Sequence, residues 1–193
     1  MLIGAYGAAL VGFVTTAVPE WTDTPRPPKT FLLTMAGLWG VGRCVGVLGF
    51  DAVGVLGAFA DIGWLAGLLL YVAHVSWRKR SWDLIGMLMW LSILLVGEIV
   101  TRIGFLGGDI MRGSQGIAAT SLAFLGLLSF ALARITVPVT NRVLDPSEAT
   151  SPYRPHPGRK NLAAGLVLLA IAGDLAGLSI EARGYLALAA GAA

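Results

Sequence analysis

Six long apolar segments follow one another along the chain, separated by short polar connectors, near residues 2–19, 31–50, 52–76, 83–107, 115–138 and 161–179. Each is close to the ~20 residues that a helix needs to cross a bilayer. Backbone groups in lipid must be satisfied within the segment, and no strand-like alternation is present, so these runs predict helices. We therefore expect an all-α, multi-pass transmembrane bundle with six full spans in one membrane domain, residues 1–193.

Both ends of the sequence indicate a longer protein. Met1 lies directly against an apolar segment, and the last apolar stretch, 184–193, has only ten residues. That stretch is too short to span and predicts the start of a seventh helix. We expect a fragment that lacks both ends. Its partners would be the lipid bilayer and either the missing helices or further copies of the chain.

Composition excludes several classes of protein. Only 13% of the residues are charged, against about 25% in soluble domains, which excludes an ordinary cytosolic enzyme or a disordered tail. The basic residues lie in connectors between apolar runs, so the net charge of +3 does not indicate a nucleic-acid partner. A single cysteine, Cys44, excludes a disulfide scaffold and a multi-cysteine metal site.

The distribution of Lys and Arg predicts the orientation. Nine of the 14 lie in the first, third and fifth connectors, residues 20–30, 77–82 and 139–160, and two lie in the even connectors. The positive-inside rule then places the odd connectors in the cytoplasm and Met1 outside.

Charged side chains inside the predicted spans are the most informative feature, because each is costly at membrane depth and marks a partner or a pathway. From the helical rise, five of them lie about 4–10 Å to the outer side of the centre of their span. A sixth, Arg134, falls near the cytoplasmic end. The five form a predicted polar layer: Arg43, Asp61, Glu98, Arg102 and Asp174.

Two interpretations of this layer stay open. In the first it is structural: Arg43 and Asp61 lie symmetrically about a short turn, Glu98 and Arg102 stand four apart in the favoured order, and a protonated Asp174 is left over. In the second the layer lines a cofactor site or a water-filled cavity. An arginine there could pair an anionic ligand while the carboxylates hold it in place.

No set of residues indicates a reaction. Motifs for phosphate binding and the His-Glu-x-x-His zinc motif are absent from the sequence. His74 falls near the cytoplasmic end of its span and His156 in a proline-rich connector, which gives no nucleophile with a base. We name no catalytic or metal-binding residue, and enzyme activity stays uncertain.

Four segments resemble the NnrS family. The most specific is GAYGAALVGFVTTAVPEWT at 4–22, a Gly/Ala-rich helix that ends in a Thr-Ala-Val-Pro-x-Trp-Thr element. Supporting matches are LWGVGRCVGVLG at 38–49, FADIGWLAGLLLYVAHVSWRKRSWDL at 59–84 and ALARITVPVTNRVL at 131–144. Their order along the chain is that of the family.

The resemblance implies a bacterial inner-membrane protein of the nitric oxide and nitrosative stress response that carries haem and copper. Family members have a His-containing segment directly ahead of the position of Met1 and further histidines in their second half, and this sequence has neither. The ligands of haem and copper would then lie in the missing parts. The alternative function is a small permease or half-transporter, since buried polar layers also mark substrate paths.

Overall fold

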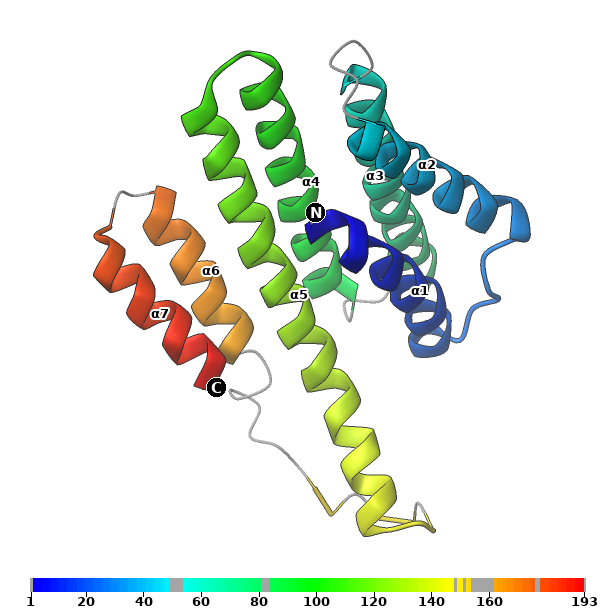
Figure 1. Ribbon diagram of the computed structural model, residues 1–193. Helices are drawn as coiled ribbons and strands as arrows, with labels where there is room; N and C mark the ends of the chain where they lie inside the picture. Colours follow the sequence, from blue (N-terminus) through cyan, green and yellow to red (C-terminus); the bar gives the residue numbers. More distant parts are fainter. Residues whose placement is uncertain are drawn as a thin grey trace. The chain divides into compact units, whose positions relative to one another are not determined.

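The structure is a computed structural model that describes residues 2–48, 54–80, 84–147, 149–150, 152–153, 162–175 and 178–192. Within the helices, the side chains of 2–5, 48, 163, 174–175, 183 and 190–192 lie outside that description. The described residues contain only α-helices and connecting turns, which confirms the all-α fold (Figure 1). The helices are α1 (Leu2–Thr22), α2 (Lys29–Leu48), α3 (Gly54–Lys79), α4 (Ile85–Leu106), α5 (Ile110–Leu144), α6 (Leu162–Leu175) and α7 (Ile180–Ala192).

Four helices in the described part are long and apolar enough to cross a membrane, namely α2, α3, α4 and α5. Large apolar side chains stand exposed on several of them, such as Val47 at 86% and Leu70 at 69%. Such exposure is unfavourable in water and is expected where a surface faces lipid. The helices are therefore those of a membrane protein, while the predicted count of six full spans and a seventh start stays a prediction.

Three helices differ in extent from the apolar segments predicted for them. The fifth span was expected to end at Pro138, but α5 continues through it to Leu144 and starts at Ile110, giving 35 residues. A proline removes one backbone donor, which is why a helix end was expected at Pro138, but the helix continues through it. The sixth segment, expected over 161–179, contains α6 with only 14 residues, or about 21 Å. Helix resumes at Ile180, four residues earlier than the predicted start at 184.

The chain divides into two compact units, Met1–Ser121 and Leu122–Ala193. Helix α3 is central to the first unit because it packs against α1, α2 and α4. Its buried face contains Trp64, Leu65 and Leu68, each at most 1% exposed, and α4 adds Trp90 and Leu94 at 0%. In the second unit α6 packs against α7. That all of 1–193 forms one membrane domain stays a prediction.

A glycine-rich turn joins α4 to α5 and sets how closely they approach. Gly108 has φ +75°, in the region that favours glycine, and the Asp109 amide donates to the Gly104 carbonyl at 2.8 Å. The Asp109 carboxylate then accepts the Arg112 amide at 3.0 Å and caps the start of α5. The sequence Gly107-Gly108-Asp109 thus ends one helix and begins the next.

The end of α5 is followed by a turn built on Asp145. Its carboxylate accepts the amide and hydroxyl of Thr150, at 2.8 and 2.6 Å, and the amide of Ser147 at 3.1 Å. Hydrogen bonds from the side chains of Ser147 and Thr150 lower the pKa of Asp145 from 3.8 to about 2.

This turn should resist acid further than an ordinary aspartate turn does. Because the folded pKa is lowered, the turn's contribution is complete above pH 3.8 and is lost as the pH falls towards about 2. Amide chemical shifts of Ser147 and Thr150, followed by NMR as the pH is lowered, should change near pH 2, and those of Asp145→Asn should stay flat. A midpoint at the ordinary value of 3.8 would contradict the assignment.

Candidate functional site

The first half of the site lies between α2 and α3. Arg43 projects from α2, and its Nη2 donates to Oδ1 of Asp61 on α3. Gly42 makes this possible, because a Cβ built at Gly42 would collide with the Asp61 carboxylate. The carboxylate therefore fills the space that a side chain on α2 would need. Asp61 is fully buried, and the Arg43 side chain is 25% exposed.

The second half of the site is formed by α4, on which Glu98 and Arg102 lie one helical turn apart. Nε of Arg102 donates to Oε1 of Glu98 at 2.6 Å, an (i, i+4) ion pair. Nη2 of the same guanidinium donates to Oδ2 of Asp61, so Arg102 joins two carboxylates on different helices. Glu98 is 2% exposed and Arg102 33%.

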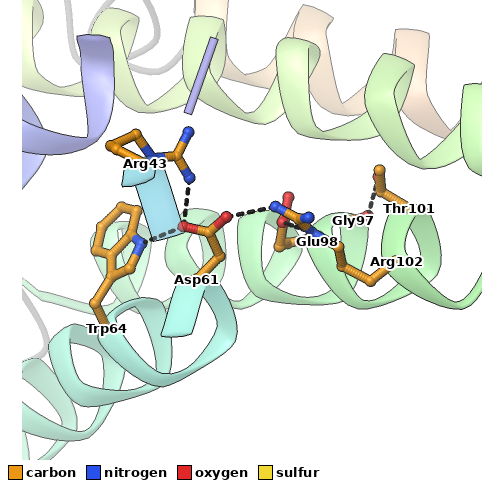
Figure 2. Close-up of polar contacts among 7 residues, drawn as sticks. All are labelled: Arg43, Asp61, Trp64, Gly97, Glu98, Thr101 and Arg102. Atoms are coloured by element: carbon orange, nitrogen blue, oxygen red, sulfur yellow. Dashed lines mark hydrogen bonds and ion pairs between the residues drawn. The ribbon is translucent and has the colours of Figure 1, made fainter. Parts of the chain in front are cut away.

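Asp61 is the centre of the arrangement, as Figure 2 shows. Each of its oxygens accepts from a different arginine, and the indole Nε1 of Trp64, one turn along α3, lies 3.4 Å from Oδ1. We call the four charged residues, Arg43, Asp61, Glu98 and Arg102, the Asp61 cluster. Its formal charges sum to zero and each one is paired, as charges in an apolar interior must be to offset their desolvation.

A pocket of about 310 Å³ lies beside the Asp61 cluster and between α4 and the first turns of α5. Its wall includes Arg43, Glu98 and Arg102 together with Thr120 of α5. Thr120 is 4% exposed, and its hydroxyl has no hydrogen-bond partner, nor has Nε of Arg43. The pocket therefore combines charged groups with buried polar atoms that a ligand or water could satisfy.

Glycines allow α5 to come this close to α4. A Cβ at Gly97 would lie 3.1 Å from the Thr120 amide nitrogen, and one at Gly116 would meet the backbone of Thr101. Thr101 turns its hydroxyl to the carbonyl of Gly97, at 2.7 Å (Figure 2). The hydroxyl is therefore satisfied within its own helix, unlike that of Thr120.

The structure brings four residues of the predicted polar layer together: Arg43, Asp61, Glu98 and Arg102. The fifth, Asp174, belongs to α6 by its backbone, but its side chain lies outside the described residues. The expected pairs, Arg43 with Asp61 and Glu98 with Arg102, are both present. The link between the pairs, from Arg102 to Asp61, was not expected. That this layer lies within the membrane and binds a ligand stays a prediction.

Sequence reasoning also missed three neighbours of the cluster. Trp64 follows Asp61 by three positions, a helical spacing that could have indicated the contact. Gly42 and Gly46 have the Gly-x-x-x-Gly spacing of closely packed helices, but of the two only Gly42 faces a neighbouring side chain. Thr120 carried no signal, since a threonine in an apolar helix commonly bonds its own backbone.

Haem and copper do not fit the described residues. No group of three or more His, Cys, Asp or Glu among them could hold a metal ion. A haem iron needs an enclosed His, Cys, Met or Tyr ligand, and the pocket wall has none. Cys44 and His74 stand exposed on their helices, and His156 lies outside the described residues.

Comparison with known proteins gives a family and no closer relative. The model of a family described as NnrS protein matches residues 1–193, which include all of the Asp61 cluster and the pocket. No curated protein and no solved structure matches the chain. The match confirms the resemblance carried by the four sequence segments.

Proposed function

Because the chain belongs to the NnrS family over residues 1–193, we propose that it is an inner-membrane module of the nitric oxide and nitrosative stress response. The family match carries this proposal. The described structure supports the membrane location in this proposal, since four helices have the length and composition of membrane spans. The haem and copper that the family implies would be held by residues outside those described.

Within this function the Asp61 cluster would provide a rigid polar site inside an apolar bundle. Two carboxylates fix the two guanidinium groups, so that the arginines keep their orientation without a bound ligand. Rigid, preoriented donors bind an incoming group with little loss of side-chain entropy. The cluster is therefore the part of the chain on which we expect function to depend.

The test expresses the protein in a bacterial strain that lacks it. Wild-type protein should restore growth in the presence of a nitric oxide donor. Arg43→Ala should fail to do so and should lower haem or copper content per molecule of protein recovered from the membrane. Arg78→Ala, a control arginine exposed at the end of α3, should restore growth. Full restoration by Arg43→Ala at normal cofactor content would argue against a role for the cluster.

We predict that the isolated 193-residue chain binds haem weakly or not at all. His74, the histidine of the described part, is exposed and lies about four turns of α3 from Asp61. The measurement is the Soret absorbance of the purified chain after addition of haem. A stoichiometric Soret band that His74→Ala abolishes would refute the prediction and move the haem site to that end of α3.

The orientation gives a further prediction. Nζ of Lys79 donates to the carbonyl of Asp23 at 3.0 Å, so the first and third connectors meet at one end of the first unit. This contact supports the prediction that the first and third connectors lie on the same side of the membrane, which the charge distribution indicates is the cytoplasmic side. A reporter enzyme fused after Lys160 should therefore be active in the cytoplasm, and periplasmic activity would overturn the orientation.

The pocket favours one alternative, a small permease or half-transporter, because polar sites within membrane bundles also bind substrates on transport paths. Uptake of labelled solutes by vesicles that contain only this chain separates the two functions. A permease should show saturable uptake without haem or copper, whereas the stress-response module should show none.

A further inference from the structure

We propose that the pocket beside the Asp61 cluster binds a small organic monocarboxylate. Its carboxylate would accept hydrogen bonds from Arg43, Arg102 and Thr120, and its short alkyl chain would lie against the apolar wall of the pocket. This inference depends on neither candidate function above.

The arginines have donors to spare. A guanidinium carries five N–H donors in a planar fork. One donor of Arg43 is used by Asp61. Two donors of Arg102 are used, one by Asp61 and one by Glu98. Nε of Arg43 is buried without a partner, and the two side chains remain 25% and 33% exposed. Both line the pocket, so the donors on the exposed parts of the two side chains are open to a bound group.

Thr120 is the second, independent observation. Its side chain is 4% exposed and lines the pocket, yet Oγ1 has no partner. A buried hydroxyl left unpaired is unfavourable. Oγ1 of Thr120 now faces Gly97, and rotation of the side chain towards the pocket would let it donate to a carboxylate oxygen there. The hydroxyls of Thr101 and Ser121, also on the wall, already donate to backbone carbonyls at 2.7 and 2.8 Å. Thr120 is thus the hydroxyl that a ligand would use.

The balance of donors and acceptors selects an anion. Both oxygens of Asp61 and Oε1 of Glu98 are occupied by arginine donors, which leaves few acceptors for a cationic ligand. Planar carboxylates match the guanidinium fork, with two oxygens at the spacing of two N–H groups. Because the cluster is neutral, a singly charged ligand adds less uncompensated charge than a sulfate would.

The remaining wall sets the size and character of the ligand. Phe105, Leu106 and Ile117 line it with apolar surface. A volume of about 310 Å³ holds a carboxylate with a short alkyl chain, and it lies at the lower end of the range for ligand pockets, about 300–1,000 Å³. We therefore take butyrate as the probe.

The test measures the thermal unfolding midpoint of the chain in lipid nanodiscs as sodium butyrate is added at constant ionic strength. A ligand that binds only the folded state raises the midpoint in a concentration-dependent way, which gives an apparent Kd. We expect butyrate to do so, and butyramide, butylamine and sodium chloride to have little effect. Protection by butyramide equal to that by butyrate would overturn the proposal.

Thr120→Val tests the same site without disturbing the ion pairs. Since the hydroxyl has no partner to lose, the variant should unfold at the wild-type midpoint or above it. Its Kd for butyrate should rise about tenfold, the value of a hydrogen bond to a charged group. Thr136→Val, on the same helix but exposed and bonded to the Leu132 carbonyl at 2.8 Å, is the matched control and should keep the wild-type Kd.

Two further results decide the proposal. Arg43→Gln should raise the Kd at least as much as Thr120→Val does, because it removes the charge that pairs with the ligand. Binding of butyrate that is unchanged in Thr120→Val, or absent from the wild-type chain, would show that the pocket is not a carboxylate site.

Discussion

Asp61→Asn should destabilise the chain by about 3–5 kcal/mol, the usual effect of removing one partner from a buried ion pair. The asparagine amide has one acceptor oxygen for two arginines, whereas the carboxylate gives one oxygen to each. Arg43 and Arg102 would keep their charges in a site where three quarters and two thirds of their side chains are covered. The unfolding free energy, measured in mixed micelles of increasing SDS fraction, provides the comparison.

Asp109→Asn is the matched control for this change. The Asp109 carboxylate lies 4.0 Å from Nε of Arg112, with the two side chains 52% and 60% exposed. Exposed pairs contribute about 0–1 kcal/mol, and asparagine caps a helix as well as aspartate does. The two variants should therefore differ by several kcal/mol. Similar losses in both would mean that Asp61 is not a buried bridging group.

Gly104→Ala should also be strongly destabilising, although it adds only one methyl group. A Cβ at Gly104 would meet the backbone of Gly113 and Arg112 on α5, and a backbone cannot rotate away as a side chain can. The two helices must separate, and such overpacking costs about 1–3 kcal/mol. We expect Gly104→Ala to lower the unfolding free energy by this amount and to enlarge the pocket between α4 and α5.

The control is Gly40→Ala on α2, where a Cβ would meet nothing within 4 Å. Alanine in a helix interior is more favourable than glycine by about 1 kcal/mol, so this variant should be as stable as wild type or more so. If Gly104→Ala also proved neutral or stabilising, the close approach of α4 and α5 would be wrong.

Much of the site could be predicted because helical geometry converts sequence position into depth. Asp61 and Arg43 flank a turn, and Glu98 precedes Arg102 by one helical turn, so both pairs follow from spacing alone. The contact between Arg102 and Asp61, 41 residues apart, does not. It depends on how far each helix is rotated about its axis, which is decided by packing against neighbours.

The same limit applies to the pocket and to the glycines. A Gly-x-x-x-Gly spacing indicates that helices can approach closely, but it could not show that Gly42 faces Asp61 while Gly46 faces open space. Thr120 could not be identified from the sequence, because a sequence does not show which buried hydroxyl is left without a hydrogen-bond partner. Helix ends were least predictable: Pro138 does not end α5, and neither of the non-helical residues described ahead of α7, Leu178 and Ser179, is a proline.

The central claim is that one carboxylate, Asp61, holds two arginines from different helices in a single buried cluster. A double-mutant cycle between Asp61→Asn and Arg102→Gln tests it most directly, with unfolding free energies for both single variants and the double variant. Residues in one ion-pair network show coupling of about 0.5–3 kcal/mol, and we predict a value in the upper half of that range. Losses that simply add, within about 0.5 kcal/mol, would show that the two residues do not interact and would contradict the account.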